Sequence, residues 1–170
     1  MTNAIFLSKA NENNKNPYFK PTTQITEVNE HAPVSTKVYK LQAEDPDILV
    51  SQQQQQSRHH GYRSSLPHHS ANENALKDNE LLNFRIENIV ALNKDGLHLE
   101  PGSPQWQQVN SFFGIDSNGY LIVTSQLHYE LASLVTLNLS VVDTSAPYPQ
   151  IGYGILVVKI IGKNKFNLFS

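Results

Sequence analysis

The amino-acid sequence predicts an all-β sandwich of six or seven short strands with two long loops. Apolar and polar residues alternate with the period of a strand, most clearly in 135–141, where every second residue is Val or Leu. Clusters of Gly, Pro, Asn and Asp separate the alternating runs. No ten-residue stretch has a convincing helical period, apart from a possible turn at 127–131. Short strands separated by turn residues are typical of β-sandwiches.

The N-terminal part divides into a polar segment and two strands. Residues 1–21 are rich in Asn and Lys and have no repeated apolar period, so we expect them to be disordered. Residues 22–28 form a short run with β-branched side chains, which ends before Pro33 because proline cannot donate to a ladder. Residues 38–44 alternate in the same way and end at Asp45-Pro46-Asp47.

A polar insertion follows at 51–80. It contains the run Gln52–Gln56 and two histidine pairs, and it buries too little apolar surface to offset its ordering entropy. We therefore predict a disordered loop within the domain. The paired histidines raise an alternative, a metal site, because neutral imidazole is the commonest metal ligand. A solvated low-complexity loop is the preferred interpretation.

The C-terminal half supplies the remaining strands. Alternation resumes at 82–87 and is followed by a second long loop, 88–110, whose Trp106 we expect to anchor the loop. Apolar runs flank an Asn-Gly dipeptide within 112–123, the strongest hairpin signal in the chain. The strand at 135–141 and a last strand at 151–161 complete the sandwich.

Composition and motifs exclude several functions. The net charge of -2 and the isoelectric point near 6.4 provide no basic field for nucleic acid. With no cysteine, the chain has no disulfide, thiolate zinc site or cysteine nucleophile. Residues 1–16 lack the charged region and the apolar run typical of a secretory signal, and the longest apolar run of the chain is about half of what a bilayer demands. The chain also lacks a phosphate loop, a Gly-x-Ser-x-Gly elbow and a His-Glu-x-x-His motif, so we expect no enzymatic activity.

Six segments, in this order, resemble the conserved pieces of a cadherin repeat: Glu27–Pro33 (family pattern Asp-x-Asn-Asp-Asn-Ala-Pro), Ala43–Asp47 (Ala-x-Asp-x-Asp), Leu82–Ile86 (Tyr-x-Ile), Phe113–Leu121 (Phe-x-Ile-Asp-x-x-Gly-x-Ile), Leu127–Glu130 (Leu-Asp-Arg-Glu) and Leu137–Asp143 (a strand ending in Ala-x-Asp). The resemblance implies a Greek-key sandwich of seven strands with an immunoglobulin-like architecture. It also implies adhesion on the extracellular side of the plasma membrane, within a larger membrane protein. The implied partners are other repeats of the parent chain and a homophilic or heterophilic cadherin.

The resemblance also implies a domain layout. Residues 22–33 resemble the last strand and outgoing linker of a truncated preceding repeat, and 34–162 form the cadherin-like domain, with 51–80 and 88–110 as loop insertions. Residues 163–170 form a tail. The early strand that carries a glutamate in the family is absent from this layout, and the chain is interpreted as a fragment.

The resemblance implies calcium as the cofactor, bound at the N-terminal junction of the repeat. Calcium takes six to eight oxygen ligands, which acids at strand ends supply. The predicted ligands are Glu27, Asn29, Glu30, His31 through its carbonyl, Asp45, Asp47 and Asp143. Two of them, Glu27 and Glu30, stand where the family has aspartate.

The C-terminal junction is expected to bind no calcium. Lys163 and Lys165 replace acids of the family linker, and His128 replaces an aspartate, which leaves Glu130 alone. Separately, Asn138-Leu139-Ser140 is an N-glycosylation sequon whose asparagine faces outward in the alternation. The alternative function is a calcium-free β-sandwich module that binds a protein partner through the Gln/His-rich insertion.

Overall fold

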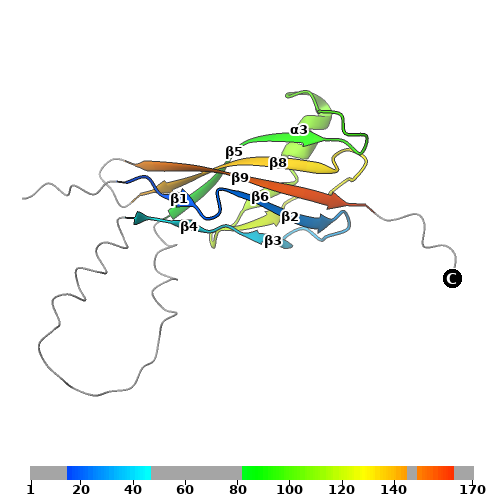
Figure 1. Cartoon of the computed structure of the whole chain (residues 1–170). Coiled ribbons are helices and arrows are strands. Elements are labelled where there is room, and N and C mark those ends of the chain that lie inside the picture. The colour runs from blue at the N-terminus through cyan, green and yellow to red at the C-terminus, as the bar shows by residue number, and fades with distance from the viewer. Residues whose placement is uncertain (1–14, 47–81, 145–148, 163–170) are drawn as a thin grey trace, which may run out of the picture.

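The computed structural model describes residues 15–46, 82–144 and 149–162. The elements are β1 (Tyr18–Phe19), β2 (Thr23–Asn29), β3 (Lys37–Lys40), β4 (Ala43–Glu44), β5 (Leu82–Leu92), α3 (Pro104–Asn110), β6 (Phe113–Ile115), β7 (Tyr120–Val123), β8 (Leu134–Asp143) and β9 (Gln150–Ile161). The strands form a four-stranded sheet of order β2-β9-β8-β5, a three-stranded sheet of order β3-β7-β6, and the pair β1-β4. The two larger sheets face each other (Figure 1) and confirm the predicted seven-stranded sandwich.

The alternation of the clearest predicted strand produces the centre of the core. In β8 the side chains of Val135, Leu137, Leu139 and Val141 are at most 2% exposed, whereas the polar residues between Val135 and Leu139 are half-buried on the other face. β8 lies between β5 and β9, and it is antiparallel to both. A strand with a neighbour on each side and one buried face is the most constrained element of such a sheet.

The predicted hairpin is confirmed as β6-turn-β7. Gly119 has φ +73°, a conformation that glycine adopts without steric cost. Asp116 organises the turn, because its Oδ1 accepts hydrogen bonds from the backbone N–H of Asn118 at 2.9 Å and of Tyr120 at 2.8 Å. The predicted turn at 127–131 is also present, and the N–H of Leu131 donates to the carbonyl of His128 at 3.1 Å.

The second predicted loop, 88–110, is wrong at both of its ends. β5 continues to Leu92, because a bulge between Ile86 and Asn88 shifts the register and returns Ile89 to the core at 4% exposure. The last seven residues of the predicted loop form helix α3. Ser103 caps this helix, because its Oγ accepts a hydrogen bond from the Trp106 N–H at 3.1 Å. Trp106 packs against the core, as expected of the residue that anchors this segment.

The assignment of residues 22–33 to a preceding repeat is wrong. β2 pairs in parallel with β9 along its whole length, from Thr23 opposite Ile155 to Asn29 opposite Ile161, so it is the edge strand of this sandwich (Figure 1). The early strand that the layout left out is therefore β2 itself. Parallel neighbours are joined through long connections, so no local pattern reveals such a pairing.

The expected disorder of 1–21 is also wrong for its last residues. Phe19 of β1 is 2% exposed and belongs to the core. Residues 1–14, the insertion 51–80 and the tail 163–170 lie outside the described residues, together with Asp47, Lys163 and Lys165. Among the described residues, no helix is long and apolar enough to cross a membrane.

Candidate functional site

Two buried carboxylates mark one end of the sandwich. Asp45 follows β4 and is 5% exposed, and Asp143 ends β8 and is 2% exposed. Strand β1 connects their sheets, since it pairs with β4 and packs against β9. We call this end, defined by Pro17, Asp45 and Asp143, the entry pole. Carboxylates are almost never buried this fully unless they are paired or bind a cation, so this pole is the candidate site.

The geometry of β1 places the two aspartates at the same pole. Tyr18 lies opposite Glu44 and Phe19 opposite Ala43, so β1 begins beside Asp45 and runs away from it along β4. On the other side, the carbonyl oxygen of Pro17 lies so close to Gly152 that a Cβ there would be 1.8 Å away. Gly152 is the strand partner of Val141, two residues before Asp143. Sequence reasoning missed this contact, although a glycine inside a strand is the signal for a close backbone approach.

A salt bridge and a hydrogen bond lock β1 onto β4 beside this pole. Glu44 accepts a hydrogen bond from the Tyr18 hydroxyl, and Lys20 Nζ lies 2.7 Å from its Oε1. The hydrogen bond from Lys20, followed by that from Tyr18, lowers the pKa of Glu44 below its ordinary value of 4.5. We call these three residues the β1–β4 clasp. The clasp fixes the segment that enters the pole.

The other predicted ligands lie at the opposite end, which we call the exit pole and define by Asn29, Glu30 and Tyr129. The Glu30 N–H donates to the Ile161 carbonyl at 3.0 Å, so β2 and β9 end together. The Glu30 carboxylate accepts a hydrogen bond from the Tyr129 N–H at 3.3 Å. Asn29 Oδ1 accepts one from the His31 N–H at 2.8 Å, so this side chain forms a local turn.

The predicted convergence of all seven ligands is therefore wrong. Asp143 pairs with Gln150 and Asn29 pairs with Ile161, and these partners are the two ends of the 12-residue strand β9. A strand of that length spans roughly 35 Å at about 3.3 Å per residue. Glu27, Asn29, Glu30 and His31 thus cannot share an ion with Asp45 and Asp143. Asp47 lies outside the described residues.

Basic groups accompany the carboxylates of the exit pole. Lys159 Nζ lies 3.5 Å from Glu27 Oε1, and Lys94 Nζ lies 2.7 Å from Glu130 Oε2. The hydrogen bond to Glu130 raises the pKa of Lys94. The described residues contain no group of three or more His, Asp or Glu side chains that is arranged to hold a metal ion. Glu27 and Glu130 therefore have ammonium partners instead of one another.

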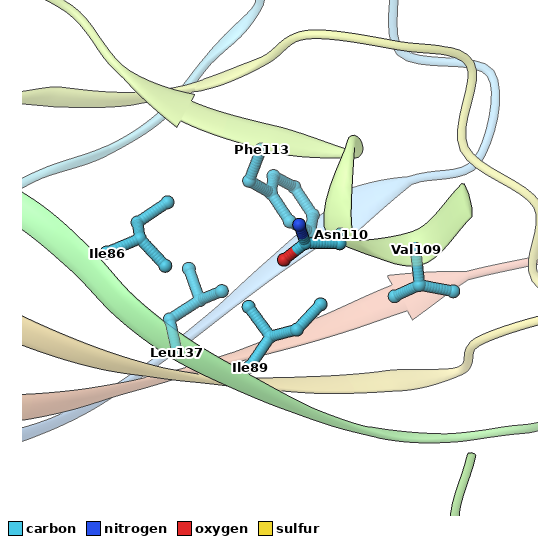
Figure 2. A pocket seen from close by; sticks show the side chains of 6 residues that line it. All are labelled: Ile86, Ile89, Val109, Asn110, Phe113 and Leu137. Carbon is cyan, nitrogen blue, oxygen red and sulfur yellow. The ribbon is translucent and has the colours of Figure 1, made fainter. Parts of the chain in front are cut away.

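A hollow of about 190 Å³ lies between β5, β8 and α3. Figure 2 shows the Asn110 carboxamide among apolar side chains. The lining residues are Ile86, Ile89, Val109, Asn110, Phe113 and Leu137. The β5 bulge and α3 create it, two features that the sequence did not predict. Its lining offers a single polar group and no acid, base or nucleophile, so it is a packing feature between the sheets.

Comparisons with known proteins agree with this architecture. No protein-family model matches the chain. Cadherin-87A of Drosophila melanogaster is 33% identical over 164 residues, which are 96% of this chain and 7% of that protein. Extracellular repeats 21–23 of human CDH23 superpose with a TM-score of 0.57 at 19% identity, over 88% of this chain and 36% of that one. The third cadherin domain of human protocadherin 7 gives 0.53 at 16% identity, over 94% and 97%. The chain is a cadherin repeat.

Membership of this family confirms two predictions from the sequence: the resemblance to a cadherin repeat and the all-β sandwich fold. It also confirms that the chain is not an enzyme, because the relatives are cadherins. The chain spans only 7% of Cadherin-87A, so this cadherin repeat corresponds to a small part of that relative.

Proposed function

We propose that this cadherin repeat is an extracellular adhesion module whose entry pole binds calcium. The observation that carries the proposal is the burial of Asp45 and Asp143 at the end where the chain enters the sandwich. In this proposal the module belongs to a larger membrane protein and contacts neighbouring repeats of its parent chain. Homophilic or heterophilic recognition then takes place between cadherins.

The donor chemistry of the entry pole fits calcium in part. Asp45 and Asp143 supply hard carboxylate oxygens from two different sheets, and calcium prefers such ligands. Two carboxylates are fewer than the six to eight oxygens that the ion takes, so the rest come from backbone carbonyls, water and residues outside the described ranges, including Asp47. A bound dication would connect the two sheets and the entering segment at this pole, which stiffens the junction.

The exit pole is proposed to bind no calcium. Two of its described carboxylates, Glu27 and Glu130, already face Lys159 and Lys94, and a dication placed there would meet these ammonium groups. The ammonium groups repel the dication and offset its attraction to the carboxylates, so binding there brings no electrostatic gain. Adjacent repeats are then held stiffly on one side of the module and loosely on the other.

Thermal unfolding of the full chain, with calcium or with chelator, tests the proposal. A ligand that binds only the folded state stabilises it by about 2.7 kcal/mol when its free concentration is a hundred times its Kd. We expect calcium to raise the melting temperature of the wild type and to have much less effect on Asp143→Asn and Asp45→Asn. Glu130→Gln is the matched control at the exit pole, and its calcium response should equal that of the wild type.

If an aspartate variant does not fold, calorimetric titration of calcium into the folded proteins replaces the melting comparison. Wild type and Glu130→Gln should then bind calcium with the same stoichiometry. An equal melting temperature in calcium and chelator, together with no heat of binding, would contradict the calcium proposal. If Glu130→Gln abolished the calcium response, the calcium site would lie at the exit pole, and the proposal of an entry-pole site would be wrong.

The alternative function, a calcium-free module acting through the insertion 51–80, concerns residues outside the described ranges. It remains a prediction. Two variants test it by capture of a protein partner. The alternative is favoured if deletion of 52–78 abolishes capture and Asp45→Ala preserves it.

A further inference from the structure

The outer face of the four-stranded sheet is apolar around one asparagine. Leu137 and Leu139 are buried at 0% and 2% exposure, so Asn138, which lies between them in β8, faces outward. Its strand partner Ile155 is 40% exposed, and Tyr153, on the same face of β9, is 69% exposed. On β2, Ile25 is 66% exposed. Exposed apolar side chains that gather on one face indicate that something covers them.

A shallow hollow lies in this face and reaches Asn138. Its volume is about 400 Å³, within the range of small-molecule sites. Asn138 and Tyr153 are diagonal neighbours across β8 and β9, a separation that an aromatic side chain bridges. The lining residues are Thr22, Thr23, Asn138, Leu139, Tyr153, Gly154 and Ile155. No hydrogen bond within the described residues holds the Asn138 carboxamide.

We propose that Asn138 carries an N-linked glycan whose first N-acetylhexosamine lies in this hollow against Tyr153. A pyranose ring has an apolar C–H face and a polar rim, so it covers an aromatic ring while its hydroxyl groups remain in water. The sequon Asn138-Leu139-Ser140 supplies the attachment point at the edge of the hollow. The inference rests on the proposed function only in that the chain passes through the secretory pathway.

The transfer reaction uses a polyprenyl pyrophosphate-linked oligosaccharide as the donor. The Asn138 amide nitrogen forms a bond to the anomeric carbon, the bond from that carbon to the pyrophosphate oxygen breaks, and the amide loses one proton to the transferase. The polyprenyl pyrophosphate leaves with the bonding electron pair. No oxidant or reductant takes part, and the side chain remains an amide.

The structure also places this transfer before folding. Ser140, the hydroxyl residue of the sequon, is 1% exposed in the folded repeat, and its hydroxyl donates a hydrogen bond to the Glu87 carboxylate on β5. A transferase that must read this hydroxyl has no access once β5 pairs with β8. Folded protein made without the modification should therefore not be a substrate for the transferase.

The first experiment measures whether the glycan is attached. The full chain is secreted from insect cells behind an added leader, and its intact mass is measured. We expect the mass of one N-glycan on the wild type and on Ser140→Thr, which keeps the sequon, and no glycan on Asn138→Gln. Asn83→Gln, at an exposed position of β5, is the matched control and should remain glycosylated. A wild-type chain without any glycan overturns the proposal.

The second experiment measures whether the sugar covers the hollow. The folded glycoprotein is treated with an amidase that removes the glycan, which requires no folding of a variant. We expect the melting temperature to fall by a few degrees in the wild type and to change much less in Tyr153→Ala. Fluorescence of an anilinonaphthalene sulfonate dye should rise on removal.

Two other outcomes overturn the proposal. The first is an equal melting shift with and without the Tyr153 ring. The second is a secreted chain without glycan that sediments as a dimer, because a second copy would then cover the face. Neither outcome alters the calcium-dependent melting, so the failure of this inference is distinguishable from the failure of the proposed function.

Discussion

Replacing Phe19 by alanine separates the observed packing of β1 from the disorder that the sequence predicts for 1–21. The side chain is 2% exposed, and its ring centroid lies 5.8 Å from that of Phe84. Truncating a buried phenylalanine costs roughly 3–5 kcal/mol. We expect about 3 kcal/mol here, because a site under a two-residue strand at the sandwich margin collapses more easily than the centre of a core. In a domain of this size, that loss lowers the melting temperature by roughly 10–20 °C.

A substitution at Gly154 tests the contact between the Phe19 ring and β9 from the side of β9. A Cβ at Gly154 would lie 2.6 Å from the Phe19 ring, so Gly154→Ala overpacks this contact. Overpacking typically costs about 1–3 kcal/mol. In a Phe19→Ala background the methyl group has space, so the cost of Gly154→Ala should largely vanish. The two substitutions must therefore be strongly non-additive.

Urea unfolding followed by the fluorescence of the single tryptophan, Trp106, measures all four proteins of this cycle. Asn16→Ala is the neighbouring control, because Asn16 is exposed and its loss should affect the midpoint much less. A Phe19→Ala cost below about 0.5 kcal/mol, in the range of ordinary surface substitutions, would refute the packing of β1 on β9. Additive costs of Phe19→Ala and Gly154→Ala would refute their contact.

Two further predictions concern the clasp and the helix. Because the pKa of Glu44 is lowered in the folded state, its contribution to stability is complete above its ordinary value of 4.5 and is lost as pH falls through the folded pKa. Wild type should thus be more stable than Glu44→Gln at pH 7, and the difference in urea midpoint should shrink as pH falls below 4.5. A difference that stays constant with pH would exclude this linkage. Ser103→Ala removes the cap of α3 and should cost about 1 kcal/mol in the same assay, while the exposed Gln105→Ala should leave the midpoint unchanged.

The candidate site was only half predictable. Asp45 and Asp143 follow directly on alternating strands, and strand ends of a sandwich meet at its poles, so their selection needed only local patterns. Glu30 was placed at the same pole because its motif was interpreted as a linker that precedes the domain. The position of Glu30 depends on which strand β2 pairs with. Because β2 pairs in parallel with β9, Glu30 lies at the exit pole and not at the entry pole.

Local sequence patterns were sufficient to predict the strands whose side chains alternate without interruption. They were also sufficient to predict the β6-β7 turn, because Gly119 and Asp116 specify that turn through local backbone geometry. The extension of β5 could not be predicted in this way, since the bulge after Ile86 breaks the period-two pattern of a strand, and the extension depends on tertiary packing. Tertiary packing also sets the place of β2, and thereby which acids share a pole. Pairing between residues more than a hundred positions apart is set by burial in the whole sandwich, and no local pattern records it.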